Sequence, residues 1–576
     1  MLTATGLKRS ELGGNGRKLV RYDGKQVLVI AQEGRLFAIA NRCPHEGYPL
    51  SEGTIGPGCV LTCNWHNWKF DLASGAALVG RDPVRTFDVA EHGGEIFIDF
   101  RDPPAEECRA RALRGIEAAI LDNDRPRMAR EAARLERAGF DAREALVHAF
   151  RLCNGRLEDG MTHAHAAAAD WLLLAARAET AAERLAAELE PLGHIAWDTE
   201  GAGEFPYPEA IAEWNGPGFV AAVEAEDEPA AIAHIRGALA EGLPYASLRA
   251  AIGEAALAHY ADFGHCAIYT LKAGQLIERL GEEIAEPVLL ALTRMLVRAT
   301  REERLPEFRS YAAALAEWDG SATAAARASD FIGLSIDGGL RRALASAGRP
   351  MRELYDALLG AVAFNLLHFD IAFERATDNA VADNVGWLDF THALTFANAC
   401  RHICEERPDL WPRAALQLAL FVGRNRKYVH ADQDMARWRV DDRQAFFART
   451  TRALYDHGFP EPIIACHRLK VLIALEDELR EAPDAAWVET ACAAVNRYLH
   501  TPMKRHHGLR IALQRSTSSP EKASTHVYKT SSCREIRNRG ARRAPWRVGL
   551  MRSISPICLR PQCNKTFCEA RLPGSV

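Results

Sequence analysis

The chain has 576 residues, of which 48% are hydrophobic and 26% are charged, with a formal net charge of −5. This length exceeds what one hydrophobic core usually organises, so we expect two to four domains, and the composition is that of a soluble globular protein. The residues before 516 are acidic overall, which argues against nucleic-acid binding, and no apolar run approaches the ~18 residues that a membrane-spanning helix needs.

The N-terminus, MLTATGLKRSELGGNGRK, lacks the apolar segment of a secretory signal. Fourteen cysteines are spread along the chain rather than concentrated in a short disulfide-rich scaffold. We therefore expect reduced thiols and a cytoplasmic location.

The first predicted elements are short β-strands. The strand candidates are residues 19–22, 26–30, 36–39, 59–62 and 95–100. Asp23-Gly24 and Glu33-Gly34 separate the first three candidates and are typical of tight hairpin turns. We expect a small antiparallel β-domain at residues 1–101, followed by a polar, proline-containing linker at residues 102–108.

Two pairs of metal-ligand residues fall in loops of this β-domain. Cys43 and His45 are two residues apart, and Cys63 and His66 are three apart, so each loop can direct both of its side chains at one atom. Two cysteines with two histidines can form a tetrahedral zinc site. A zinc-stapled structural protein is therefore one interpretation of these four residues.

The order of the ligands resembles the Rieske iron–sulfur domain, in which Cys-x-His is followed, after a gap, by Cys-x-x-His. The resemblance covers residues 1–101. Matching positions around the ligands are Pro44, Gly47, Leu50 and Gly53 in the first loop and Trp65, Trp68, Phe70, Asp71 and Gly75 in the second. It implies that Cys43 and Cys63 hold one iron of a [2Fe-2S] cluster and that His45 and His66 hold the other.

This sequence departs from the respiratory branch of the Rieske family. Tyr48 and Trp65 occupy the positions of its disulfide-forming cysteines, and Asn67 and Trp68 follow the second histidine where that branch has a hydroxyl donor. Fewer hydrogen bonds to the cluster sulfurs favour a low reduction potential, roughly −150 mV. The resemblance therefore implies the ferredoxin and oxygenase branch, with one-electron transfer from an external reductase.

From about residue 109 to 512 the composition becomes rich in Ala, Leu, Arg and Glu. Apolar residues recur at three- and four-residue spacing, as in DWLLLAARAETAAERLAAELE, which predicts a large all-α domain. The Gly- and Pro-rich residues 190–219 predict a break between two helical halves. The helical texture differs from the β-rich catalytic domain of ring-hydroxylating Rieske oxygenases.

Four histidines in helical segments are candidate ligands for a further iron: His163, His265, His368 and His392. His265 and His392 both occur in the pattern Asp-Phe-x-His, and a carboxylate often orients a metal-ligating imidazole. We hypothesise that the four histidines converge in the helical core and bind an iron that takes electrons from the cluster. The alternative is that these polar pairs only stabilise helix packing.

After residue 512 the amphipathic pattern stops. Residues 516–576 hold twelve Lys or Arg against three Asp or Glu, so we expect a disordered basic tail at residues 513–576. The sequence as a whole predicts a Rieske redox protein whose helical domain is an oxygenase or oxidoreductase acting on a small organic molecule. The alternative is a non-enzymatic electron carrier or redox sensor whose helical domain is a protein-docking module.

Overall fold

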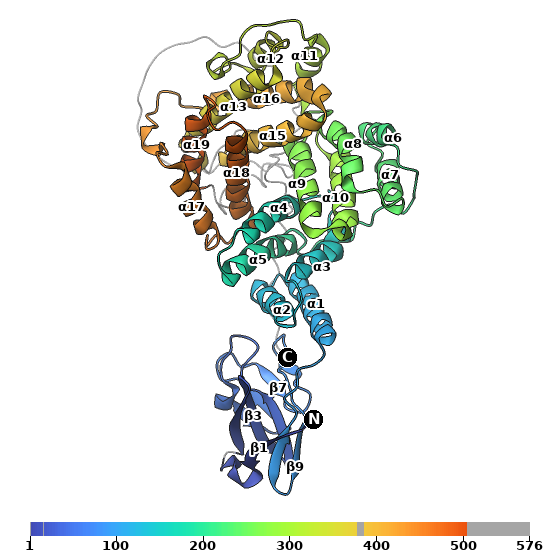
Figure 1. Ribbon diagram of the computed structural model, residues 1–576, viewed down its shortest axis with the longest axis vertical. Helices are drawn as coiled ribbons and strands as arrows, with labels where there is room; N and C mark the ends of the chain where they lie inside the picture. The colour runs from blue at the N-terminus through green and yellow to red at the C-terminus, as the bar shows by residue number, and fades with distance from the viewer. Residues whose placement is uncertain (1, 15, 377–384, 504–576) are drawn as a thin grey trace, which may run out of the picture. The chain divides into compact units, whose positions relative to one another are not determined.

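The computed structural model describes residues 2–14, 16–376 and 385–503. The chain forms two compact units, of which the first ends at Cys108 and the second begins at Arg109 (Figure 1). The predicted linker at 102–108 is partly helical, because the first helix starts at Ala105. The predicted tail at 513–576 lies outside the described residues.

The N-terminal unit is a small antiparallel β-domain, as predicted. Its described strands form three sheets with the orders β1-β10-β9, β2-β3-β4 and β5-β6-β7-β8. The strands are β1 (Thr3–Lys8), β2 (Arg17–Tyr22), β3 (Lys25–Gln32), β4 (Arg35–Ala40), β5 (Thr54–Gly56), β6 (Val60–Thr62), β7 (Lys69–Asp71), β8 (Ala77–Val79), β9 (Val89–His92) and β10 (Glu95–Ile98).

The hairpin turns at Asp23-Gly24 and Glu33-Gly34 are confirmed. All four residues have positive φ, between 44° and 77°, which is the backbone twist that two-residue hairpins require. Strand β3 between them is buried on both faces, because its side chains alternate between two hydrophobic cores. Leu28 and Ile30 pack in the core that also contains Cys43 and Cys63.

The second unit is helical, as predicted. Its described helices are α1 (Ala105–Leu121), α2 (Arg125–Arg137), α3 (Arg143–Cys153), α4 (His163–Ala176), α5 (Ala181–Asp198), α6 (Gly216–Glu224), α7 (Glu228–Ala240), α8 (Tyr245–Leu257), α9 (His265–Leu280), α10 (Ala285–Arg298), α11 (Tyr311–Glu317), α12 (Ile336–Leu344), α13 (Met351–Leu367), α14 (Ile371–Arg375), α15 (Trp387–Glu406), α16 (Trp411–Asn425), α17 (Arg443–Leu454), α18 (Pro462–Glu481) and α19 (Val488–His500). Within the described part of the chain, no helix combines the length and apolar character needed to cross a lipid bilayer.

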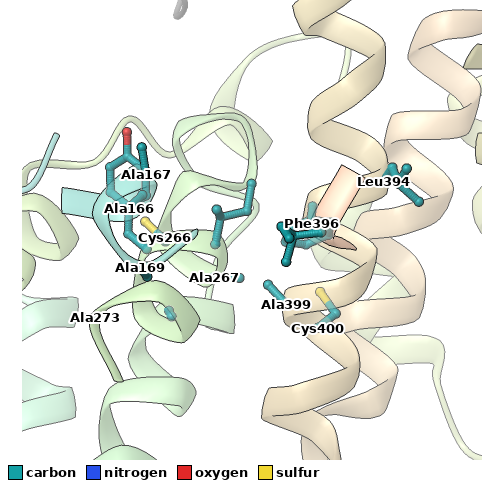
Figure 2. Close-up of a cluster of buried hydrophobic side chains, with 14 of the residues drawn as sticks. Ala166, Ala167, Ala169, Cys266, Ala267, Ala273, Leu394, Phe396, Ala399 and Cys400 are labelled. Carbon is teal, nitrogen blue, oxygen red and sulfur yellow. The ribbon is translucent and has the colours of Figure 1, made fainter. Parts of the chain in front are cut away.

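Four of these helices enclose the centre of the helical unit. α4 packs against α9, α9 against α15, α15 against α18, and α18 against α4 (Figure 1). Small side chains let the helices approach closely: Figure 2 shows Ala166 and Ala169 of α4, Ala267 of α9 and Ala399 of α15 in one buried cluster. The four helices therefore form a closed ring around the side chains that point to its centre.

The non-helical break expected at residues 190–219 starts only after Asp198, and it does not divide the helical unit into two halves. Helix α5 continues to Asp198 with Pro191 inside it, because its buried residues Leu192 and Ile195 keep the helix packed in the core. The chain is then non-helical until α6 begins at Gly216. Helices from before and after this segment, such as α4 and α9, pack directly against each other within one unit.

Candidate metal centres

The two predicted cluster-binding loops share one backbone turn. In each loop the cysteine and the residues four and five positions later close the same pair of hydrogen bonds. These are Cys43 N to Tyr48 O (2.9 Å), Gly47 N to Cys43 O (2.8 Å), Cys63 N to Trp68 O (2.8 Å) and Asn67 N to Cys63 O (3.0 Å). Gly47 and Asn67 both have positive φ, 75° and 61°, a conformation that Gly and Asn adopt at low cost.

These turns bring the four predicted ligands together. Nδ1 of His45 and Nδ1 of His66 lie 3.1 Å apart, with the rings edge to face. Cys43 and Cys63 are buried, and desolvation together with the neighbouring Cys63 thiol raises the pKa of Cys43 to about 11. A thiol with a raised pKa, such as Cys43, ionises readily only when a cation binds it. The donor set therefore fits one iron on the two sulfurs and one on the two Nδ1 atoms.

Aromatic side chains surround the two imidazoles. Trp68 stacks on His45 at 4.7 Å, and Trp65 lies beside His66 at 5.7 Å. The positions that carry a disulfide in the respiratory branch instead hold a pair of rings, Tyr48 and Trp65, 5.4 Å apart. Trp65 is 61% exposed, so one aromatic side chain beside His66 is accessible.

A second group of ligand residues lies in the helical unit. Among the described residues, we call His163, His265, His392 and His467 the four-histidine cluster. His163 and His265 are the first residues of α4 and α9, and His392 and His467 are the sixth residues of α15 and α18. The Nε2 atoms of successive histidines lie 3.2, 3.0 and 3.4 Å apart. One histidine thus comes from each helix of the central ring.

The structure brings three of the four predicted histidines together and leaves one out. His368 lies at the end of α13, where its ring stacks on Phe364 and its Nδ1 faces the carbonyl of His430 at 3.4 Å. His467 takes the fourth place and was missed from the sequence. Its signal was a polar pair, His467 and Lys470, spaced one turn apart in a helical stretch that is otherwise largely apolar.

The outer nitrogens of three cluster histidines each face a backbone carbonyl. The contacts are His265 Nδ1 to Asp262 O (2.6 Å), His392 Nδ1 to Leu388 O (2.5 Å) and His467 Nδ1 to Ile463 O (2.7 Å). A carbonyl oxygen only accepts, so each Nδ1 carries the proton and each neutral ring presents an Nε2 lone pair to the centre. His163 instead has its Nδ1 3.1 Å from the Tyr269 hydroxyl.

Burial keeps the cluster neutral. Desolvation, followed by the charge of Lys470, lowers the pKa of His163, His265 and His467 below the usual range, for His265 to about 3. The same burial, with the neighbouring imidazoles, lowers the pKa of His392 well below 6.5. Lone pairs 3.0 to 3.4 Å apart with no proton between them repel, and a cation bound between them would remove this repulsion.

The predicted carboxylate–imidazole pairs do not form on helices. At His265, the carbonyl of Asp262 is closer than its carboxylate, whose Oδ2 lies 3.8 Å from Nδ1. Asp389 turns away from His392: it accepts from the backbone N–H of Gly386 at 2.9 Å and pairs with Arg424 at 2.9 Å. Asp389 turns away from His392 because it lies in the first turn of α15, where backbone N–H groups that have no helical partner attract a carboxylate.

A strained turn delivers His265 to the cluster. Asp262, Phe263 and Gly264 have successive φ values of 46°, 56° and 82° immediately before α9. The buried carboxyl of Glu302 accepts from the Phe263 N–H at 3.0 Å and holds the turn. Non-glycine residues in this region cost free energy and concentrate at functional sites.

Two buried ion pairs fasten the ligand helices in pairs. Asp170 of α4 accepts from Lys272 of α9 at 2.6 Å, seven residues after the cluster histidine on each helix. Arg401 of α15 pairs with Glu478 of α18 at 2.9 Å. Each pair fixes the separation of the two helices whose histidines are in contact.

The sequence of the N-terminal unit matches known proteins. A family model for the Rieske [2Fe-2S] domain matches residues 6–88. The chain is 35% identical over 84 residues to the 3-phenylpropionate/cinnamic acid dioxygenase ferredoxin subunit of Escherichia coli K12, covering 14% of this chain and 79% of that protein. It is 34% identical over 98 residues to 4beta-methylsterol monooxygenase of Methylococcus capsulatus, covering 15% of this chain and only 26% of that relative.

A solved structure is also similar to part of the chain. The ferredoxin of carbazole 1,9a-dioxygenase from Nocardioides aromaticivorans IC177 is 26% identical, with a TM-score of 0.17, and covers 18% of this chain and 99% of that chain. Both ligand loops lie inside the residues that the family model matches. Through its N-terminal unit the chain therefore belongs to the Rieske [2Fe-2S] family, which carries electrons on an iron–sulfur cluster.

Proposed function

We propose that the chain is a Rieske oxidoreductase in which electrons that arrive through the [2Fe-2S] cluster are used at an iron centre in the helical unit. The four-histidine cluster would hold this iron. The proposal rests on one observation about His265, His392 and His467. Each of these rings bonds a backbone carbonyl through Nδ1, while the Nε2 atom of His392 lies 3.0 Å from that of His265 and 3.4 Å from that of His467. Metal-ligating histidines characteristically donate their other N–H in this way.

The distances between neighbouring histidines agree with ligands of a single metal ion, and the ligand atoms of His163, His392 and His467 all lie within 4.8 Å of one another. With metal–nitrogen bonds of about 2.1 Å, neighbouring ligand atoms lie about 3.0 Å apart at right angles and about 3.4 Å apart in a tetrahedron. The observed Nε2 separations of 3.2, 3.0 and 3.4 Å fall in this range. Imidazole suits iron as a ligand, and iron can exchange single electrons with the cluster.

The proposed reaction inserts one atom of dioxygen into a C–H bond of a small organic substrate. It consumes two electrons and two protons and releases the second oxygen atom as water. When bound, the [2Fe-2S] cluster takes up and releases one electron at a time, so an external reductase would supply the two electrons singly. Similarity to a dioxygenase ferredoxin subunit and to a monooxygenase supports this class of reaction.

Iron content tests the proposal. The purified full-length protein should contain three iron atoms per chain, two in the cluster and one in the helical unit. His392→Ala should contain two and keep the spectrum of the reduced cluster, whereas His368→Ala, a matched control outside the four-histidine cluster, should keep three. Two irons in both the wild type and His392→Ala would instead favour an electron carrier or redox sensor whose helical unit is a docking module.

A further inference from the structure

His265 stands apart from the other three members of the four-histidine cluster. One ligand atom from each of His163, His392 and His467 lies within 4.8 Å of those of the other two. His265 contacts two of these three histidines, with its Nε2 3.2 Å from that of His163 and 3.0 Å from that of His392. Three protein ligands are typical of catalytic metal sites, in which a fourth position stays exchangeable.

The backbone also fixes the ring of His265 differently. His392 and His467 lie inside α15 and α18, and the Nδ1 of each donates to the carbonyl four residues earlier in its own chain segment. Regular helix geometry therefore sets the place of both rings. The Nδ1 of His265 donates instead to the carbonyl of Asp262, which lies in the strained turn before α9. A movement of this turn would therefore move the His265 ring.

The strained turn stores free energy that its movement would release. Asp262 and Phe263 have φ values of 46° and 56°, which residues with a Cβ adopt only at a cost. Hydrogen bonds hold the turn in this form. The Asp262 N–H donates to the carbonyl of Thr300 at 2.8 Å, and the Phe263 N–H donates to the buried carboxyl of Glu302 at 3.0 Å. Relaxation of the turn would offset part of the cost of breaking a bond between His265 and a metal.

We infer that three histidines of the cluster are permanent ligands of the helical metal and that the fourth, His265, is exchangeable. A small molecule with a nitrogen or oxygen donor atom would take its place. In this exchange the bond from His265 Nε2 to the metal breaks, a bond to the incoming donor atom forms, and no electron is transferred. The inference rests on the proposed iron centre and adds to it the position at which an exogenous molecule binds.

Removal of single histidines tests which ligands are permanent. The full-length His265→Ala protein should still bind one Co²⁺ per chain in its helical unit, whereas His392→Ala and His467→Ala should bind none there. Added imidazole should fill the vacated position in His265→Ala and change its Co²⁺ difference spectrum, recorded against the same protein without Co²⁺, with a single saturating affinity. Azide should bind the Co²⁺ form of His265→Ala at least tenfold more tightly than that of the wild type, where it must displace the histidine.

A matched pair of variants tests the role of strain. Asp262→Gly and Asp262→Ala both remove the carboxylate, but only glycine adopts a φ of 46° without strain. Asp262→Gly should therefore hold His265 more firmly on the metal and bind azide at least threefold more weakly than Asp262→Ala. The Asp262 side chain is 32% exposed, so both variants should fold, as helical circular dichroism will check. Equal azide affinity in the two variants would overturn the inference that the turn makes His265 exchangeable.

The outcomes distinguish this inference from the proposed function. If folded His265→Ala loses Co²⁺ as completely as His392→Ala does, His265 is a permanent ligand, and the inference is wrong while the metal centre stands. Azide that leaves the Co²⁺ spectra of both His265→Ala and the wild type unchanged would contradict it in the same way. A wild-type helical unit that binds neither Co²⁺ nor iron would overturn the proposed centre itself.

Discussion

Nε2 of His265 and Nε2 of His392 lie 3.0 Å apart in the core of the helical unit, although each ring already donates its Nδ1 proton to a carbonyl. Neither nitrogen then has a proton to share with the other. Buried acceptors that face each other in this way cost free energy unless a cation lies between them. This contact is therefore the feature on which the proposed metal centre of the helical unit chiefly rests.

Tyr269→Phe should weaken metal binding in the helical unit. The Tyr269 hydroxyl is the side-chain partner of His163 Nδ1, and loss of such an outer hydrogen bond typically costs 10- to 100-fold in metal affinity. The measurement is Co²⁺ titration of the metal-free helical site. Tyr245→Phe, which removes another buried hydroxyl bonded only to the carbonyl of Thr270, is the matched control and should bind Co²⁺ as the wild type does.

Lys272→Met should destabilise the helical unit by about 3–5 kcal/mol, because it leaves the carboxylate of Asp170 buried without its partner. The double variant Lys272→Met/Asp170→Leu should recover most of this loss, since an apolar pair replaces the ion pair. Urea unfolding followed by helical circular dichroism measures both changes. A double variant as unstable as the single one would show that the ion pair itself, not the buried charge, holds α4 to α9.

The left-handed turn at Asn67 should control cluster incorporation. Asn67→Val forces a β-branched residue to φ of 61° and should cost about 1–2 kcal/mol in the loop that carries Cys63 and His66. We expect less cluster per purified chain, measured from its visible absorption. Asn67→Gly adopts the same φ freely and should retain the full cluster content; equal losses in both variants would mean that the Asn side chain matters.

Acid should destabilise the helical unit partly through His194. Burial lowers the pKa of His194 to about 3, whereas an unfolded histidine titrates near 6.5. Between these values the unfolded chain binds a proton that the folded chain does not, so stability is full above pH ~6.5 and falls as the pH drops, by up to about 1.4 kcal/mol per pH unit. His194→Gln should therefore show a shallower decline in melting temperature between pH ~6.5 and ~4.

The charged residues near His194 do not invalidate the comparison between the wild type and His194→Gln. Asp198 lies 3.7 Å from its Nε2, and burial raises the pKa of Asp198 to about 7, which acts in the opposite direction. Glu190 and Arg125 also contribute to the electrostatic surroundings of His194. All three residues are present in both proteins, so their contributions cancel to first order in the difference. Parallel pH profiles for the wild type and His194→Gln would contradict the prediction.

The candidate cluster ligands could be predicted from the sequence because they are local. Each Cys and His pair lies within four residues, and the turn that orients it closes within six. The same holds for the hairpins, where Asp23-Gly24 and Glu33-Gly34 dictate their own backbone conformation. Short-range patterns of this kind leave few alternatives for the chain.

The four-histidine cluster could be predicted only in part. Its contacts join residues 102, 127 and 75 positions apart, so they depend on how α4, α9, α15 and α18 pack. His368 and His467 both occur in apolar helical stretches, and only the rotation of each helix decides which one faces the centre. The Asp-Phe-x-His pattern pointed to His265 and His392, which do lie in the cluster. The expected reason was a carboxylate that orients each imidazole, but backbone carbonyls orient both rings instead.

The sequence by itself determined the family of the N-terminal unit and the helical class of the remainder, because these follow from spacing and periodicity along the chain. Tertiary structure alone decided which histidines meet in the core and which backbone carbonyls orient their rings. Those features arise where four helices meet, and the direction of a side chain at such a meeting point is set by packing rather than by its neighbours in sequence.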